Sequence, residues 1–453
     1  MIPPSSRALP ALRALGSGVL LILFVDCGAS TPRTDQRSRS LAERPKVLMI
    51  GIDGADWQVL RPLMAAGKLP NFTKVVEGGT SGVLRSMEPT LSPALWTTIA
   101  TGRPPSVHRI SDFVETLPDG RYQPVTSDDR AAPAFWNLIG NQGDAGREVG
   151  VVAWLASWPA EPVHGYVVTS YLPYIYNWST GRPLKGTVVE GIPRQTHPAS
   201  LLAEIEPLKV RPEAVDRDLL AGFYDPSAPA RLGKDAAECV EGFLWSLASD
   251  ETYRRIGLHL YRSHPVDLFA VYFGGIDVVS HRFWKFTYPD DMPYGADPAE
   301  IEILKRVIPS YYAYMDRIVG EFLPLLDERT TLLILSDHGF KPVSFPGKPT
   351  TSGHHRLEGI VALYGRGIAP GRTLAGATLL DILPTVFALM GEPISRQLPG
   401  KVLAEAFALP GTERLKVDYV DAYPERPPRA SAAAGEEVDA NVLERLRSLG
   451  YIQ

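Results

Sequence analysis

The chain has 453 residues, of which 45% are hydrophobic and 21% are charged, so it is long enough to bury a large core. Its 46 basic and 51 acidic residues give a net charge of -5, which argues against binding to a nucleic-acid duplex or broadly to an anionic membrane surface. It has two cysteines, Cys27 and Cys239, so a mature protein without Cys27 can form no internal disulfide, and cysteine cannot be the principal metal ligand.

The first 30 residues have the features of an export signal. Arg7 and Arg13 give a basic start, and residues 14–25 form a nearly continuous apolar run without charge. The run is shorter than the ~20 residues that a membrane-spanning helix needs, so it fits the core of a signal peptide better than an anchor. We therefore expect a protein exported to the periplasm, the cell envelope or the medium, with a polar linker over residues 31–45.

Cys27, just after the apolar run, resembles the lipid-modified cysteine of bacterial lipoproteins. That pattern has a small residue where this chain has Asp26, and cleavage after Ala29 is the alternative. The sequence does not decide between lipidation of Cys27 and cleavage after Ala29. Attachment to a membrane through the N-terminus also stays open.

From Lys46 onward, short and mostly apolar runs alternate with segments of helical periodicity. Apolar strands separated by helices indicate a sheet that is buried on both faces. The alternation predicts an α/β fold, with helices sandwiching a mostly parallel central sheet, in a catalytic domain over residues 46–423. The predicted strands are 46–52, 149–153, 267–273, 330–335 and 360–364, and the predicted helices are 70–77, 93–100, 132–140, 236–263, 299–326 and 379–390.

Residues 166–233 break this alternation and are rich in Pro, Gly, Tyr and Trp. They predict an inserted cap region over one end of the sheet, which would set the choice of substrate. The chain ends in a tail over residues 424–453. Its first part is rich in Pro and Ala, which indicates a loosely held segment, and residues 442–449 predict a short amphipathic helix.

Polar residues follow the apolar runs, at the edge where open parallel sheets bind ligands. Asp53 follows the run 46–52, and Gly54 lets the backbone turn close to a ligand, although an Asp-Gly turn without function is the alternative. Ser92 stands directly before Pro93 and a helical segment, which predicts that Ser92 caps the helix. A helix N-terminus favours an anion through its free N–H groups and its dipole, but a plain capping serine has the same geometry.

Two Asp-His combinations follow later runs. Asp277 and His281 are four residues apart, so on a helical turn both would face one metal ion; a helix-start aspartate and an exposed histidine are the alternative. The adjacent pair Asp337 and His338 ends an apolar run, where both side chains are costly to bury without partners. A metal ion would supply that partner.

Together these residues form a ligand set without a thiolate. The set is Asp53, Asp277, Asp337, His281, His338 and either His354 or His355. Carboxylates and imidazoles in this mixture suit Zn²⁺, with Mn²⁺ as the second choice. The charges of three carboxylates and one serine alkoxide would be balanced by two divalent ions. The sequence therefore predicts two divalent metal ions beside Ser92.

Seven motifs resemble, in their order, the type I phosphodiesterase and nucleotide pyrophosphatase family of the alkaline phosphatase superfamily. They cover about residues 46–407 and are specific for the superfamily but not for a substrate. The resemblance implies an alkaline phosphatase-like fold and a metal-dependent hydrolase of small phosphate esters, such as nucleotides, lipid head groups or glycan phosphates. The motifs are GIDGADW, LPNFTKVVEGGT, PTLSPALWTTIATGRPPSVH, DVVSH, SDHGF, GHHRLEG and DILPTVFALMGEP.

The resemblance also implies a role for each residue. One metal ion would be held by Asp53, Ser92, Asp337 and His338. The other would be held by Asp277, His281 and a histidine of GHHRLEG, where the spacing in the family favours His355 over His354. Ser92 stands at the position of the family nucleophile, nine residues before Thr101 of the Thr-Gly pair, which implies a covalent phosphoseryl intermediate.

Some features depart from the family pattern. Ser92 stands where many members have threonine, and His108-Arg109-Ile110 replaces the more usual His-Gly-Ile. The asparagine that binds phosphate in the nucleotide pyrophosphatases has no clear counterpart, so nucleotide specificity stays open. No arginine clearly meets the third free oxygen of a phosphomonoester, with Arg103 and Arg356 as the remaining candidates, so we expect diesters to turn over at least as well as monoesters.

Three other functions would share parts of this site. A phosphotransferase acting on an envelope glycan or lipid would use the same metals and the same export route. A sulfatase-like relative would need a Cys or Ser followed by x-Pro-x-Arg, whereas Pro93 follows Ser92 at once and Trp96 stands where the arginine would be. A non-catalytic relative with structural metals would not need a hydroxyl nucleophile at a helix N-terminus.

Overall fold

The computed structural model describes residues 44–116, 122–139, 146–173, 175–176, 186–187, 192–293, 295–344, 350–408 and 415–426. These residues belong to one compact unit, Arg44–Gln453. The predicted export signal, Cys27, most of the linker and residues 427–453 of the tail lie outside the described residues. Among the helices that the structure does describe, none combines the length and the apolar character that a bilayer crossing requires.

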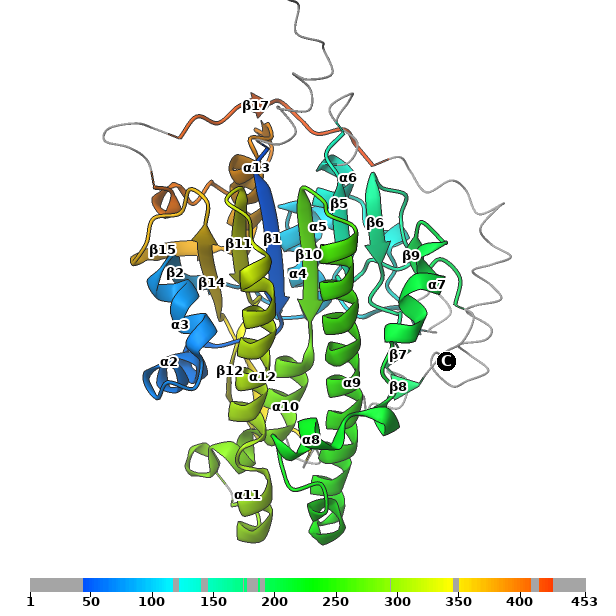
Figure 1. Cartoon of the computed structure of the whole chain (residues 1–453), viewed down its shortest axis with the longest axis vertical. Helices are drawn as coiled ribbons and strands as arrows, with labels where there is room; N and C mark the ends of the chain where they lie inside the picture. The colour runs from blue at the N-terminus through cyan, green and yellow to red at the C-terminus, as the bar shows by residue number, and fades with distance from the viewer. Residues whose placement is uncertain are drawn as a thin grey trace, which may run out of the picture. The chain divides into compact units, whose positions relative to one another are not determined.

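The centre of the described residues is a nine-stranded sheet (Figure 1). Its order is β15-β2-β14-β11-β1-β10-β5-β6-β9. The five neighbours from β11 to β6 run parallel, whereas β14 is antiparallel to β11 and β2, and β9 is antiparallel to β6. The predicted fold, a mostly parallel α/β sheet, is confirmed. The strands are β1 Lys46–Ile52, β2 Thr80–Arg85, β5 Val149–Val152, β6 Gly165–Val168, β9 Thr196–His197, β10 Leu268–Phe273, β11 Thr330–Leu335, β14 Glu358–Gly365 and β15 Arg372–Thr378.

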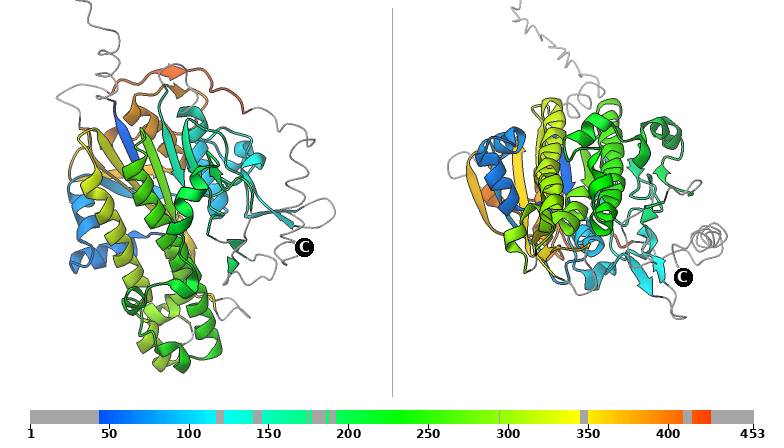
Figure 2. Two further views of the ribbon diagram at one scale, coloured as in Figure 1. Left: turned by 45° about the vertical axis from the view of Figure 1, so that its right-hand side comes forward. Right: turned by 90° about the horizontal axis from the view of Figure 1, so that it is seen from below.

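Helices cover both faces of this sheet. Figure 1 shows α9 and α12 in front of the sheet and α4 and α13 behind it, and Figure 2 shows α9 and α12 side by side when seen from below. Because both faces are covered, β10 and β11 are buried along their whole length, as their apolar sequences predict. The helices are α2 Trp57–Ala65, α3 Pro70–Glu77, α4 Ser92–Thr101, α5 Pro105–His108, α6 Phe135–Ile139, α7 Leu201–Ile205, α8 Arg217–Ala221, α9 Lys234–Ser263, α10 Gly275–Thr287, α11 Pro298–Leu304, α12 Val307–Phe322 and α13 Ile382–Met390.

The other strands in the described part of the chain form four two-stranded sheets. One of them, β12 with β13, lies beside the end of β11 and carries part of the candidate site described below. The pairs are β3 Val114–Thr116 with β4 Tyr122–Pro124, β7 Ile175–Tyr176 with β8 Gly186–Thr187, β12 Gly339–Pro342 with β13 Gly353–Arg356, and β16 Ile394–Ser395 with β17 Tyr419–Val420.

The single helix predicted over residues 299–326 is divided. It forms α11, α12 and a short 3₁₀ turn at Leu323–Leu325. Pro309 lies in the first turn of α12, where a missing N–H does no harm, but the middle of a continuous helix would not tolerate it. Pro324 follows the end of α12 for the same reason.

The segment predicted as an insertion, from about residue 166 to about residue 233, contributes two short strands to the central sheet. Residues up to Val168 belong to β6, which pairs in parallel with β5, and Thr196–His197 adds the edge strand β9. Both strands are short, with four and two residues. Runs of this length give almost no periodic signal, which is why the sequence does not reveal them.

The prediction of a loosely held tail from residue 424 is wrong for Arg426. Its guanidinium donates to Glu161 Oε1 at 2.8 Å and to the backbone carbonyls of Ser127 and Arg130. Arg130 also donates to Glu161, through Nη2 to Oε2 at 2.5 Å. This buried ion cluster fixes the chain up to residue 426 against the domain.

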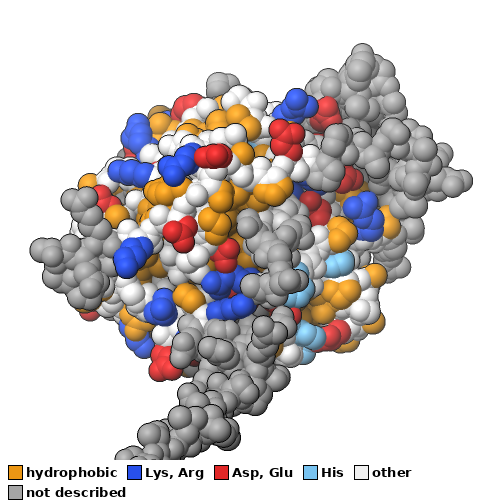
Figure 3. All heavy atoms as spheres, turned by 90° about the horizontal axis from the view of Figure 1, so that it is seen from above, with side chains coloured by type: hydrophobic (Ala, Val, Ile, Leu, Met, Phe, Trp, Pro, Cys, Tyr) orange, Lys and Arg blue, Asp and Glu red, His pale blue; other side chains and the backbone are white. Residues whose placement is uncertain are grey.

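Figure 3 shows the domain from above, the end at which β1 begins in Figure 1. Lys, Arg, Asp and Glu side chains are interspersed there with hydrophobic ones, as on an ordinary protein surface. The strands β1 and β10 point toward the opposite end. Their carboxyl ends, where open parallel sheets bind ligands, therefore lie at that opposite end.

Candidate metal and catalytic site

Three neighbouring strands bring the predicted residues together. In the order β11-β1-β10, Asp337 and His338 follow β11, Asp53 follows β1, and Asp277 lies on α10 just after β10. Because these strands are parallel, their carboxyl ends meet at one edge of the sheet.

Further ligands come from outside the sheet. His281 lies one turn after Asp277 on α10, His355 lies on β13, and Ser92 is the first residue of α4.

One group of donor atoms surrounds His338. Its Nε2 lies 3.2 Å from Asp53 Oδ1 and 3.6 Å from Asp337 Oδ2. Ser92 Oγ lies 3.4 Å from Asp53 Oδ1 and 3.5 Å from His338 Nε2. The ligand atoms of Asp53, Asp337 and His338 converge closely enough to hold one ion, with the Ser92 hydroxyl at its edge.

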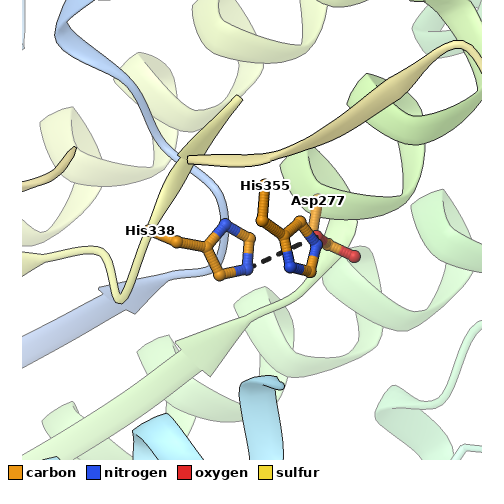
Figure 4. A group of neighbouring side chains, drawn as sticks. All are labelled: Asp277, His338 and His355. Atoms are coloured by element: carbon orange, nitrogen blue, oxygen red, sulfur yellow. Dashed lines mark hydrogen bonds and ion pairs between the residues drawn. The ribbon is translucent and has the colours of Figure 1, made fainter. Parts of the chain in front are cut away.

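A second group adjoins the first (Figure 4). Asp277 Oδ1 lies 3.1 Å from His355 Nε2 and 3.4 Å from His281 Nε2, and the two imidazole Nε2 atoms are 2.8 Å apart. Figure 4 shows the imidazoles of His338 and His355 next to each other, with the Asp277 carboxylate beyond His355. The two rings stack with centroids 3.7 Å apart, and Asp277 Oδ1 lies 3.7 Å from His338 Nε2. The structure therefore brings together all the predicted ligands as two adjoining groups. Which atoms bind metal stays a prediction.

The far nitrogen of each histidine fixes its orientation. His281 Nδ1 lies 2.8 Å from the Gly353 carbonyl, and His355 Nδ1 lies 2.7 Å from the Thr90 carbonyl. A carbonyl only accepts, so each Nδ1 carries a proton, and in the neutral ring Nε2 then presents a lone pair to the site. Two lone pairs 2.8 Å apart repel each other unless a cation lies between them. Metal-binding histidines are commonly held in this way.

Asp337 gives the clearest sign that a cation belongs here. Its side chain is fully buried, and within the described residues neither carboxylate oxygen has a hydrogen-bond partner. Burial, and then the neighbouring charges of Asp53 and Asp277, raise the pKa of Asp337 well above its usual range. A divalent ion would remove this penalty, so the residues present fit a metal centre.

Two other titratable groups of the site, Asp277 and His338, have a lowered pKa. Although burial opposes ionisation, the imidazoles of His281 and His355 hold the pKa of Asp277 well below its usual range. Burial, and then the adjacent His355, lower the pKa of His338. An ionised carboxylate and a neutral imidazole are the forms that bind metals.

The prediction that Ser92 caps α4 is wrong. Leu91 takes the cap position, and no side chain caps the helix. Ser92 is the first helical residue, and its hydroxyl turns toward Asp53 and His338 instead of toward the helix N–H groups. The plain capping alternative therefore loses its geometric basis.

Several residues hold the ligands in place but carry no signal in the sequence that would reveal this role. Asp56 is buried and accepts from Phe340 N and from both ends of the Arg356 guanidinium, two bonds of 2.7 Å, so it ties β13 to the start of α2. Trp96 and Tyr272 both donate to Asp53. The partners are 43 to 300 positions apart, and no local pattern in the sequence links them.

The unusual His-Arg-Ile segment keeps a tight turn. Arg109 adopts φ 67°, in the left-handed region where glycine is favoured, directly after α5. The buried His108 accepts from Ile110 N at Nδ1 (3.1 Å), so its Nε2 carries the proton and faces Thr98 Oγ1 at 3.0 Å. The loop geometry that glycine usually provides is therefore retained with arginine.

His108 makes a testable contribution to the pH dependence of stability. Burial, and then the charge of Arg130, lower its pKa from 6.5 to about 4. A lowered pKa means that the stability is complete above pH 6.5 and is lost as the pH falls toward 4, by about 3 kcal/mol. Denaturant unfolding of His108→Gln should show that much less loss between pH 7 and pH 4 than the unmodified protein. Identical pH profiles would contradict this role.

The chain matches a known protein family over most of its length. The family model described as type I phosphodiesterase / nucleotide pyrophosphatase matches residues 47–426. GPI ethanolamine phosphate transferase 3 of Schizosaccharomyces pombe is 27% identical over 155 residues, which are 33% of this chain and only 14% of that protein.

Solved structures are similar at low identity. Murine ectonucleotide pyrophosphatase / phosphodiesterase 5 is 13% identical, with 79% of this chain and 97% of that chain covered and a TM-score of 0.46. Phosphonoacetate hydrolase from Sinorhizobium meliloti, in complex with phosphonoformate, is 19% identical, with 66% of this chain and 57% of that chain covered and a TM-score of 0.36.

Proposed function

The chain belongs to the type I phosphodiesterase / nucleotide pyrophosphatase family of the alkaline phosphatase superfamily, and we propose that it is a hydrolase that cleaves small phosphodiesters through a covalent bond to Ser92. One observation carries this proposal: the Ser92 hydroxyl lies 3.4 Å from Asp53 and 3.5 Å from His338, beside a buried set of metal-type ligands.

The proposed cofactors are two divalent ions, Zn²⁺ by preference and Mn²⁺ as the alternative. Asp53, Ser92, Asp337 and His338 would hold one ion, and Asp277, His281 and His355 the other. When bound, the two ions supply positive charge for the ionised serine and for the oxygens of the phosphoryl group.

The chain's own residues supply the nucleophile and its position. The Ser92 Oγ–phosphorus bond forms as the bond to the leaving alcohol breaks, and the alcohol departs with a proton. Water then attacks the same phosphorus, and Ser92 leaves and recovers its proton. Ser92 is only 3% exposed, which limits the access of bulk water to its hydroxyl.

Two arginines bear on the choice between diesters and monoesters. The sequence leaves Arg103 and Arg356 as candidates for the third free oxygen of a monoester. Arg103 donates to the Gln397 carbonyl at 2.5 Å and to Gln397 Oε1 at 2.8 Å, and Arg356 is held by Asp56. Both guanidinium groups therefore already have partners, which favours a diester with two free oxygens.

A substrate panel tests the proposed function. Bis(4-nitrophenyl) phosphate and 4-nitrophenyl phosphate release the same chromophore, so their kcat/KM values compare directly. We expect the diester to be cleaved at least as well as the monoester, and both activities to be lost on chelation. A strong preference for the monoester would overturn the diester proposal, and chelator-insensitive activity would overturn the metal site.

A phosphotransferase is the second candidate, because a segment of this chain resembles an ethanolamine phosphate transferase. Such an enzyme would pass the group on Ser92 to a lipid or glycan hydroxyl instead of to water. Adding candidate alcohols to the diester assay distinguishes the two functions. Transfer predicts a new phosphodiester product, whereas hydrolysis predicts the same product with and without the alcohol.

We also propose that the enzyme is exported, on the basis of the basic start, the short apolar run and Cys27 near the N-terminus. Export would place the site where phosphodiesters of the cell envelope or the surroundings can reach it. Whether Cys27 carries a lipid is answered by the mass of the N-terminal peptide of the mature protein.

A further inference from the structure

The two oxygens of the Asp53 carboxylate have different surroundings. Oδ2 accepts two hydrogen bonds, from Tyr272 OH at 2.6 Å and from Trp96 Nε1 at 3.0 Å. Oδ1 instead faces Ser92 Oγ and His338 Nε2. A carboxylate whose second oxygen is already occupied by two donors can offer only its first oxygen to a metal ion.

The donors are themselves held firmly in the core. Gly51 of β1 pairs with Tyr272 of β10, and a side chain on Gly51 would meet the Trp96 ring at 2.6 Å. The absence of a side chain there makes room for the indole. Trp96 and Tyr272 pack edge to face, with ring centroids 5.0 Å apart.

Trp154 also packs against the Trp96 indole. Its ring lies edge to face with Trp96, with centroids 5.2 Å apart, and its Nε1 donates to the Trp96 carbonyl at 3.1 Å. Both Trp96 and Trp154 are fully buried. The indole of Trp96 therefore cannot turn away from Asp53 without disturbing the core.

Asp337 in the same group is different. Within the described part of the chain, neither of its oxygens has a hydrogen-bond donor. The two carboxylates of this group therefore differ. Asp53 has one oxygen available to a metal ion, whereas both oxygens of Asp337 are available.

Resting on the proposed function, we propose that Trp96 and Tyr272 are positioning residues that fix Asp53 as a one-oxygen ligand and hold that oxygen next to the Ser92 nucleophile. If either donor is lost, the carboxylate can rotate or offer both oxygens, and the ion beside Ser92 is held less well. Partners of this kind are typically worth 10- to 100-fold in metal affinity or activity.

The test is a Zn²⁺ titration of metal-free protein against a chromophoric chelator, which needs no turnover. We expect Trp96→Phe and Tyr272→Phe each to bind one of the two zinc ions about tenfold more weakly, and the double variant about 100-fold more weakly. The other ion, held through Asp277, should keep its affinity.

Two matched controls lose a similar bond elsewhere. Trp136→Phe removes the hydrogen bond of 2.8 Å that the indole donates to Glu161. Tyr314→Phe removes the hydrogen bond of 3.0 Å that the phenol donates to Glu251. These variants should lose comparable stability and keep both zinc affinities within twofold.

Three outcomes would overturn the inference. Equal zinc binding by Trp96→Phe, Tyr272→Phe and the unmodified protein would refute it while leaving the proposed function intact. A loss of affinity as large in the controls would show a general effect of destabilisation. An unmodified protein that binds no zinc or manganese would contradict both the inference and the function on which it rests.

Discussion

Replacing Ser92 by alanine is expected to abolish turnover of aryl phosphodiesters while the protein stays folded and loaded with metal. In the serine protease subtilisin, loss of the covalent nucleophile lowers kcat by roughly 10⁶-fold, and we expect a large loss of the same kind here. Because Leu91 and not Ser92 occupies the cap of α4, the change should cost little stability. Steady-state kinetics, thermal unfolding and metal analysis of one preparation measure all three quantities.

Two further variants separate the hydroxyl from the shape of the side chain. Ser92→Thr keeps the hydroxyl and should retain measurable activity, provided that the buried site accommodates one methyl group. Ser92→Asn keeps a polar side chain without a hydroxyl and should be inactive. Near-normal turnover by a metal-loaded Ser92→Asn would exclude the covalent mechanism and would direct attention to the neighbouring hydroxyl of Thr90 or to direct attack by water.

Replacing Asp337 by alanine is expected to remove one of the two metal ions and to lower activity by roughly 100-fold or more, since loss of even an outer partner costs 10- to 100-fold. Elemental analysis and diester kinetics measure both effects. The stability should change in opposite directions with and without metal. Metal-free Asp337→Ala should be at least as stable as the metal-free unmodified protein, because it no longer buries two unpartnered carboxylate oxygens.

With metal present the order should reverse. Binding raises the free energy of unfolding of the unmodified protein by about 4 kcal/mol when the free ion is at a thousand times its Kd. Asp337→Ala lacks most of this stabilisation because it binds that ion poorly. Asp316→Ala is a suitable control, because Asp316 is also buried but accepts from Phe72 N and from Asn71 at the start of α3, away from the metal groups. It should lose stability with and without metal and keep both ions. An Asp337→Ala protein that retains two ions and full activity would refute the assignment.

The sequence predicts most of the fold because its central strands are apolar along their length. The run at Lys46–Ile52 forms β1 with the predicted bounds, and Thr330–Leu335 forms β11 likewise. The edge strands are different. Residues of β15 are largely exposed, and β9 has only two residues, so hydrophobicity does not mark either of them.

The candidate site is predictable where it depends on strand ends and on costly burial. Asp53 and Asp337 attract attention because each carboxylate ends an apolar run, and the structure places both at one edge of the sheet. The choice between His354 and His355 depends on which side of β13 faces Asp277, and the structure places His355 there. Residue types alone do not decide that.

The remainder depends on contacts between distant positions. The bond from Tyr272 to Asp53 spans 219 residues, and the pair of Asp56 and Arg356 spans 300. The prediction that Ser92 caps α4 is wrong for a related reason. The local pattern of serine before proline favours a cap, but the site on β1 and β11 turns the hydroxyl away from the helix.

The central claim is tested most directly by trapping the covalent intermediate. Metal-loaded protein is mixed with bis(4-nitrophenyl) phosphate, quenched in acid within the first turnovers and digested for peptide mass spectrometry. We predict one equivalent of nitrophenol in an initial burst and a 4-nitrophenyl phosphoryl group on Ser92. An active, metal-loaded enzyme that shows no burst and no adduct, or an adduct on Thr90 instead of Ser92, would contradict this account.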